Sequence, residues 1–222
     1  MVRAIKIGRL NCLCEFSAGI EKIAYVLYPM NFLSGWISGA ADRYGINIVV
    51  ITGMEWEDVF SPWPAKGVPD GSPDFKGESP EFLKQLQTSV IPKLEETFGL
   101  TAPTERTLVG ISMSGLFSMW QWLVCDTFDN IASLSGSFWY EGFVDWVRAH
   151  TSVSKRGKAY FLLGKQESRS NVKAFNSVAD DTREIVAFLK SRGINTEFES
   201  VPGNHYSDPL PRLEKAFTAL YG

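Results

Sequence analysis

Histidine and cysteine are scarce in this sequence. Its 222 residues include two histidines, His150 and His205, and three cysteines, Cys12, Cys14 and Cys125. Two histidines exclude a three-histidine zinc site, and the HExxH motif, the CxxC pair and the EF-hand loop are all missing. The phosphate-binding patterns GxxxxGKS/T and GxGxxG are missing as well. We therefore expect no metal ion and no cofactor, and a chemistry carried by side chains alone.

The sequence also lacks an excess of basic residues and any long apolar run. It carries 22 Lys and Arg against 25 Asp and Glu, for a net charge of −3, so we expect no binding to nucleic acid or to a membrane. No run reaches the roughly 18 apolar residues of a membrane span. The N-terminal segment MVRAIKIGRLNCLCEF lacks the apolar core and cleavage site of a signal peptide, and a low, odd number of cysteines is typical of reduced thiols. These features predict a cytoplasmic protein that acts on a small molecule, and they leave its oligomeric state open.

Short apolar runs alternate with helical patterns along the whole chain. Several runs are apolar at consecutive positions, which is typical of parallel strands buried on both faces. The alternation predicts one α/β domain over residues 1–222, with a mostly parallel sheet and helices on both of its faces. The predicted strands are Lys22–Tyr28, Asn47–Thr52, Arg106–Ile111, Asn130–Leu134, Ala159–Leu163 and Thr196–Val201, and an antiparallel edge pair is predicted at Ala4–Ile7 and Leu10–Phe16.

Three helices have recognisable ends, and one segment has no periodicity. A helix is expected to begin at Ser79-Pro80 and to kink at Pro92, another to cover Val178–Arg192, and a last one to follow Pro209 and Pro211. The aperiodic segment, Met54–Glu78, holds four prolines, three glycines and four aromatic residues. A loop of this length is often functional, so we expect it to lie beside a ligand site or to pack its aromatic residues on the core.

The stretch Arg106–Trp120, RTLVGISMSGLFSMW, joins an apolar strand to an amphipathic helix through a tight turn. A nucleophile elbow has this layout, with a strained serine at its apex and small residues two positions before and after it. Gly110 and Ser112 fit, whereas Ser114 stands where glycine is usual. The pattern predicts that Ser112 is a catalytic nucleophile; the alternative is that Ser112 or Ser114 only caps the helix.

A serine nucleophile needs a histidine base and an acid that orients it. In the hydrolase order of serine, acid and histidine, His205 is in the required place, because it follows the last predicted strand. His150 ends a helical stretch and is interpreted as a surface residue. Glu167 follows the preceding strand and is the predicted acid. Other acids remain open as alternatives, namely Glu141, Asp180 and Asp181.

The oxyanion of such a reaction is stabilised by two backbone N–H groups. One belongs to the residue after the nucleophile, here Met113. The other is expected in the turn after the Lys22–Tyr28 strand, at Met30 or Asn31, because Pro29 has no N–H.

Five segments carry a family resemblance: SPWPA at 61–65, GISMSGLF at 110–117, SLSGSFWYEGF at 133–143, LLGKQE at 162–167 and PGNHY at 202–206. In these segments the chain resembles the putative-esterase family of α/β-hydrolases, the group that contains esterase D and the enterochelin esterases. The resemblance implies an α/β-hydrolase fold and hydrolysis of carboxylic esters by Ser112, Glu167 and His205. The chain departs from the family pattern at Ser114, and it shows no separate binding domain.

The substrate pocket is predicted among aromatic residues near the ends of the strands, at Trp56, Trp63, Trp139 and Tyr140. No insertion is long enough for a large lid domain. The leading hypothesis is a serine hydrolase that cleaves small carboxylic esters through an acyl-enzyme. Acyl transfer and thioester cleavage use the same residues, and a hydrolase-fold protein that binds without catalysis is the third possibility. The acyl and alcohol groups and the physiological role are not encoded in any recognisable motif.

Overall fold

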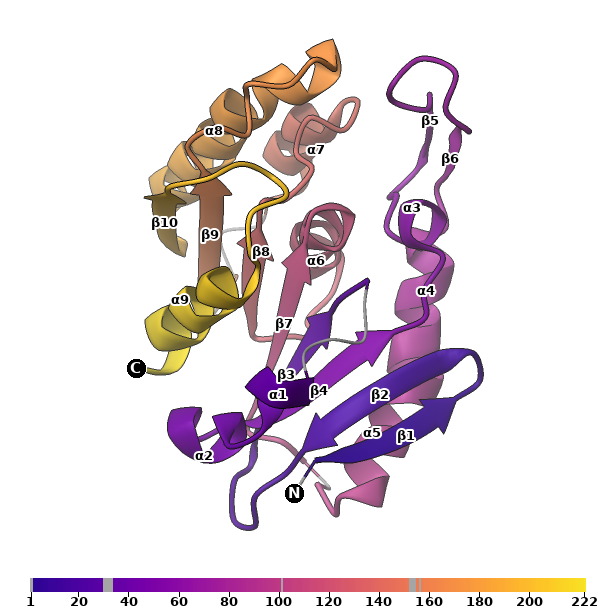
Figure 1. Ribbon diagram of the computed structural model, residues 1–222, viewed down its shortest axis with the longest axis vertical. Helices are drawn as coiled ribbons and strands as arrows, with labels where there is room; N and C mark the ends of the chain where they lie inside the picture. Colours follow the sequence, from indigo (N-terminus) through magenta and orange to yellow (C-terminus); the bar gives the residue numbers. More distant parts are fainter. Residues whose placement is uncertain (1, 30–33, 101, 152–154, 156) are drawn as a thin grey trace.

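The computed structural model describes residues 2–29, 34–100, 102–151, 155 and 157–222 (Figure 1). Its centre is an eight-stranded sheet with the order β1-β2-β4-β3-β7-β8-β9-β10. The strands are β1 (Arg3–Ile7), β2 (Leu10–Glu15), β3 (Lys22–Leu27), β4 (Asn47–Thr52), β7 (Glu105–Ile111), β8 (Asn130–Leu134), β9 (Lys158–Gly164) and β10 (Asn195–Val201). The pairs β1–β2 and β2–β4 are antiparallel and all others are parallel. The predicted parallel sheet and its antiparallel edge are confirmed.

Helices cover both faces of the sheet because successive side chains of the inner strands point to opposite sides. In β3, Ile23, Tyr25 and Leu27 belong to one core and Ala24 and Val26 to the other. The first core is closed by α4 (Ser79–Gln85), α5 (Ile91–Thr97), α6 (Met113–Val124), α7 (Phe143–His150) and α8 (Val178–Ser191). The second is closed by α1 (Ser34–Ile37), α2 (Ala40–Tyr44) and α9 (Leu210–Tyr221).

The kink expected at Pro92 takes the form of a π-helical turn. Between α4 and α5 the chain forms η1 (Leu86–Val90), and Pro92 lies in the first turn of α5. Proline has no N–H to donate and its ring crowds the carbonyl of the residue four positions earlier. The wider π turn just before Pro92 relieves this steric clash, so the helix continues from α4 into α5.

The aperiodic segment 54–78 is more ordered than the sequence predicts. It forms α3 (Trp56–Val59) and an antiparallel hairpin of β5 (Pro64–Ala65) and β6 (Phe75–Lys76). The hairpin projects beyond the end of the sheet (Figure 1), and we call residues 64–76 the finger. Strands of two residues are too short to show an alternating pattern, which is why the sequence conceals them. Large lid domains are absent from the described residues, as predicted.

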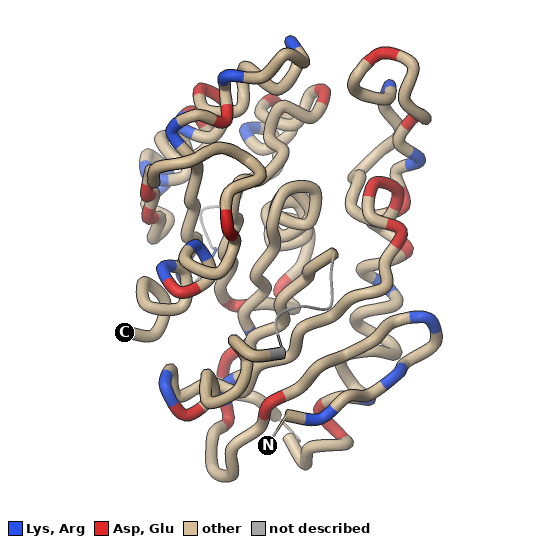
Figure 2. The backbone as a smooth tube through the Cα atoms, in the orientation of Figure 1, with Lys and Arg blue, Asp and Glu red and all other residues tan. Residues whose placement is uncertain are grey.

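Charged residues are dispersed over the molecule. Figure 2 shows Lys and Arg interleaved with Asp and Glu, without one end that carries a single sign. None of the helices in the described ranges combines the length and apolar composition that a bilayer crossing requires.

Candidate active site

Ser112 lies at the apex of the turn between β7 and α6. Its backbone has φ 59° and ψ −123°, a conformation that is strained for any residue with a side chain. Hydrogen bonds from β8 and the loop after it hold this conformation: the Ser112 N–H donates to the Leu134 carbonyl at 3.0 Å, and the Ser137 N–H donates to the Ser112 carbonyl at 3.1 Å. The turn therefore has the geometry of a nucleophile elbow.

The small residues that the elbow requires are explained by close backbone contacts. A Cβ on Gly110 would lie 2.0 Å from the Ser114 carbonyl oxygen, so no larger residue fits. Ser114, the departure from the usual glycine, is fully buried. Its hydroxyl accepts the Ile111 N–H at 2.8 Å and donates to the Leu27 carbonyl at 3.0 Å. Serine at this position therefore ties the elbow to the end of β3.

We expect Gly110→Ala to lower the stability by about 1–3 kcal/mol, because the added methyl group forces strand and helix apart, and to reduce turnover because Ser112 moves with the helix. Urea unfolding and kcat measure the two effects. Gly35→Ala is the matched control, since a Cβ there meets nothing within 4 Å. If both variants showed the same stability and the same kcat, the packing argument would be contradicted.

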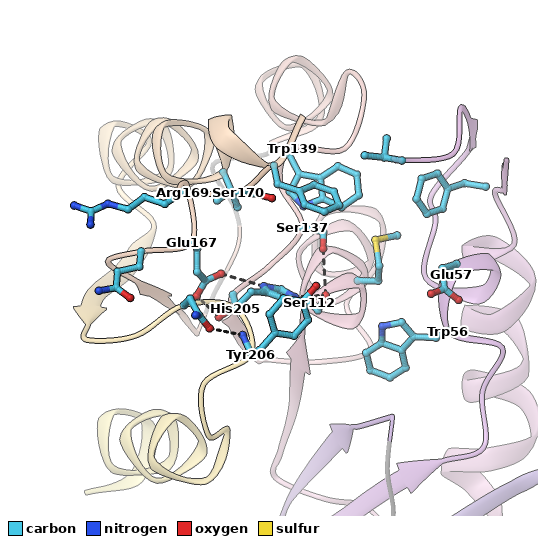
Figure 3. Close-up of a pocket in the computed structure, with 18 residues that line it drawn as sticks. Trp56, Glu57, Ser112, Ser137, Trp139, Glu167, Arg169, Ser170, His205 and Tyr206 are labelled. Carbon is cyan, nitrogen blue, oxygen red and sulfur yellow. Dashed lines mark hydrogen bonds and ion pairs between the residues drawn. The ribbon is translucent and has the colours of Figure 1, made fainter. Parts of the chain in front are cut away.

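The structure brings Ser112, His205 and Glu167 into one chain of contacts (Figure 3). The His205 Nε2 lies 3.0 Å from the Ser112 Oγ, and the His205 Nδ1 lies 3.1 Å from the Glu167 Oε2. The three residues follow β7, β9 and β10, whose carboxyl ends meet at one edge of the parallel sheet.

Of the four candidate acids, all of which are described, Glu167 alone has its carboxylate against His205. Asp180 instead pairs with Arg183. Asp181 lies in the first turn of α8, and burial raises the pKa of its carboxyl. Glu141 is exposed before α7. The second histidine, His150, is exposed at the end of α7 and stacks on Trp146, as the sequence predicts.

Glu167 is buried and yet held in its ionised form. Only 1% of its side chain is exposed, and burial alone would raise its pKa. Hydrogen bonds from His205, from the Ser135 hydroxyl at 2.7 Å, from the Gly164 N–H at 2.7 Å and from Arg212 outweigh this effect, and the pKa of the carboxyl is lowered. The acid is therefore charged over the neutral pH range and can orient the imidazole.

Sequence reasoning missed the buried cation of this site, Arg212. Its side chain is 5% exposed; Nη1 contacts the Glu167 Oε1 at 2.8 Å and also the Ser135 hydroxyl, and Nη2 donates to the Asn204 carbonyl at 2.5 Å. Arg212 thus connects the acid with the residue before His205. Its neighbour Pro211 marks only a helix start, and no motif signals a buried arginine there.

The loop after β8 also contributes polar groups to the site. Ser135 has φ 53°, which aims its hydroxyl at Glu167. The Ser137 hydroxyl lies 3.4 Å from the Ser112 Oγ. Both belong to the SGSFWY segment, which the sequence comparison with the esterase family singles out without giving these serines a role.

Met113 is placed as the oxyanion prediction requires. It begins α6 directly after Ser112 and lines the cavity, and the first N–H groups of a helix have no partners within it. Met30 and Asn31, the residues predicted to supply the second donor, lie outside the described residues.

A cavity of about 390 Å³ opens above Ser112. Trp56 and Trp139 line it as predicted, and Phe75 of the finger and Phe175 add to its apolar wall. Polar groups from the loops after β9 and β10 line the remaining side, namely Gln166, Arg169, Ser170 and Asn204.

Trp63 and Tyr140 were predicted to line the pocket and do not. The Tyr140 hydroxyl donates to the Trp63 carbonyl, and the Trp63 Nε1 donates to the Glu141 carbonyl at 3.1 Å. Trp63 also packs on Phe143 and Trp146. Adjacent aromatic residues in a loop point in different directions, so Trp139 faces the cavity while Tyr140 anchors the base of the finger.

One acidic cluster lies outside the site. Glu55, Asp58 and Glu78 place carboxylate oxygens within 4.8 Å of one another. Glu55 pairs with Arg9 at 2.5 Å and Asp58 with Lys76 at 2.6 Å. Basic side chains therefore neutralise two of the three carboxylates.

Comparison with known proteins identifies the family of the chain. Residues 31–213, which include Ser112, Glu167 and His205, match the family model described as "Putative esterase". The chain belongs to this family. It is 31% identical to the "Uncharacterized protein YbbA" of Bacillus subtilis (strain 168) over 186 residues, covering 78% of this chain and 74% of that protein.

Solved structures share the fold. An IroE-like serine hydrolase from Shewanella oneidensis matches with a TM-score of 0.78 at 14% identity, over 100% of this chain and 79% of that one. The siderophore hydrolase EstB from Aspergillus nidulans matches with a TM-score of 0.76 at 17% identity, over 100% and 94% of the two chains. The α/β-hydrolase fold and the resemblance to the putative-esterase family are thereby confirmed, and this family member is a carboxylic ester hydrolase.

Proposed function

We propose that the protein hydrolyses small carboxylic esters through an acyl-enzyme formed on Ser112. The observation that carries the proposal is the unbroken contact chain from the Ser112 Oγ through both nitrogens of His205 to Glu167. A serine hydroxyl becomes an effective nucleophile when a neighbouring imidazole takes its proton, and the carboxylate holds that imidazole in the required tautomer.

The reaction runs in two halves. In the first, His205 takes the Ser112 proton, the oxygen attacks the ester carbonyl, and the carbonyl oxygen becomes an oxyanion that accepts a hydrogen bond from the Met113 N–H. The bond to the alcohol oxygen then breaks, and His205 returns the proton to that oxygen. In the second half, water repeats the attack on the acyl group and restores the free serine hydroxyl.

The cavity supports a small and largely apolar substrate. Its volume, about 390 Å³, is near the lower end of ligand pockets. Trp139 and Phe175 pack together with ring centroids 4.6 Å apart and form an apolar wall. An acyl chain of a few carbons or a single aromatic ring suits this space.

Hydrolysis of p-nitrophenyl acetate and butyrate tests the proposal, together with labelling by a fluorophosphonate probe. We expect the wild-type protein to turn over both esters and the label to appear on the peptide that contains Ser112. Ser191→Ala, at the exposed end of α8, is the control that keeps both properties. If the wild type is inert toward the esters and Ser112 resists the probe, the proposal fails.

We also propose a cytoplasmic location and a small-molecule partner. All three cysteines are free. Burial raises the pKa of Cys12 to about 11 and, with the neighbouring Cys12, that of Cys14 to about 12, so these two thiols stay protonated and unreactive. Over the part of the chain that the structure describes, the interleaved charges form no basic surface for nucleic acid or anionic lipid.

A further inference from the structure

Tyr206 is an unusually exposed aromatic residue at the mouth of the cavity. Among the described residues, the exposed large apolar side chains are those of Val124, at 45%, and Tyr206, at 90%. Tyr206 lines the same cavity as Ser112. An aromatic ring left in water beside a reactive group gains most when a ligand covers it.

The exposure of Tyr206 does not come from a loose turn. The Tyr206 N–H donates to the Asn204 Oδ1 at 3.0 Å, and the Asn204 N–H donates to the Ser207 hydroxyl at 2.9 Å. Arg212 holds the Asn204 carbonyl from within the protein. The Tyr206 ring meets the His205 ring edge-on, with centroids 5.5 Å apart and an interplanar angle of 87°. The hydrogen-bonded turn thus places Tyr206 directly beside the base.

That place is on the alcohol side of the ester. In acylation the proton that His205 takes from Ser112 passes to the alcohol oxygen, so the departing alcohol must lie against His205. In the view of Figure 3, Trp139 lies above Ser112, and Tyr206 lies below it, next to His205. Trp139 is therefore placed for the acyl group and Tyr206 for the alcohol.

We propose that Tyr206 is a specificity-determining residue that binds the alcohol part of the ester and selects planar aromatic alcohols such as phenols and naphthols. This inference rests on the proposed function and names the alcohol class of the same site. The ring supplies a flat apolar surface, and edge-to-face or offset stacking gives it a preference for aromatic groups over aliphatic ones of similar size.

The test compares two acetates that differ only in their alcohol: 2-naphthyl acetate and hexafluoroisopropyl acetate, whose alcohol is also acidic but not aromatic. Tyr206→Ala is expected to lower kcat/KM about tenfold for the naphthyl ester and to leave the other ester within about twofold. Tyr206→Phe should behave as wild type on both, because the ring and not the hydroxyl makes the contact. The rate of acetyl-enzyme breakdown, measured after the burst, should be the same in all three proteins, since the alcohol has left by then.

Val124→Ala, remote on α6, removes the other exposed apolar side chain and should leave kcat/KM unchanged for both esters. An equal loss on both esters would show that Tyr206 only supports His205, and no loss on either would show that the alcohol does not contact it; both results overturn the assignment. If the wild type hydrolyses neither ester and Ser112 resists the fluorophosphonate probe, the proposed function itself is wrong, and the assignment of Tyr206 falls with it.

Discussion

Ser112→Ala and His205→Ala are each expected to reduce kcat for p-nitrophenyl butyrate by about four to six orders of magnitude, with little change in KM. The hydroxyl and the imidazole act as one unit across 3.0 Å, so removing either abolishes nucleophilic attack. For the same reason the double variant should be no slower than the single ones. What remains would be the contribution of substrate binding and of the oxyanion contact.

His150→Ala is the matched control for the histidine, because His150 is exposed at the end of α7. It should leave kcat within about twofold of wild type. Near-normal turnover by His205→Ala, or a further large loss in the double variant, would contradict a shared role for the two residues. Steady-state kinetics on the wild type and the four variants, with circular dichroism to verify folding, decides between these outcomes.

Arg212→Met is expected to destabilise the protein by about 3–5 kcal/mol at neutral pH and to lower kcat as well. The substitution leaves the Glu167 carboxylate buried without its cation, which is one of the costliest single changes in a protein interior. It also removes the donor to the Asn204 carbonyl, so the turn that carries His205 loses a support. Urea unfolding and kcat measured on the same samples report the two effects.

The stability loss should depend on pH. In the wild type the pKa of Glu167 is lowered from its ordinary value of 4.5, so its ionisation stabilises the fold above that value, and this contribution is lost as the pH falls through the folded pKa. Without Arg212 the folded pKa rises, and protonation relieves the uncompensated charge. The difference in stability between Arg212→Met and wild type should therefore shrink as the pH is lowered from 7 toward about 4.

Two controls separate the buried pair from a general effect of losing an arginine. Arg43→Met breaks a half-exposed pair with Glu214 and should cost no more than about 1 kcal/mol. The double variant Arg212→Met, Glu167→Gln should lose less stability than the sum of the single variants, because each removes the charge that the other leaves unpaired. Strict additivity would show that the two side chains do not interact.

The sequence predicted Ser112, His205 and Glu167 from the order of the strands. Each follows a predicted strand, and the carboxyl ends of parallel strands meet at one edge whatever the details of packing. Arg212 could not be found in this way. Its contacts reach residues 45 and 77 positions away, and an arginine near a helix start is usually a surface residue.

Side-chain direction in loops was the second limit of prediction. Trp139 and Tyr140 are neighbours, but one faces the cavity and the other the base of the finger. Within a strand or helix a fixed periodicity assigns each residue to a face. The loop after β8 has no such periodicity, and the positive φ of Ser135 turns the chain in a way that neighbouring residue types do not reveal.

The finger contributes to the substrate cavity but not to the contacts among the reacting residues. Its base is fixed by Tyr140, and Val68 and Phe75 face the cavity, while the contacts of Ser112, His205 and Glu167 all come from other segments. Lengthening a surface turn is inexpensive, since doubling a loop costs only about 0.6 kcal/mol in chain entropy. Insertions between Ala65 and Phe75 can therefore reshape the pocket while the reacting groups stay in register, which makes this hairpin the natural site for evolving or engineering new ester preferences.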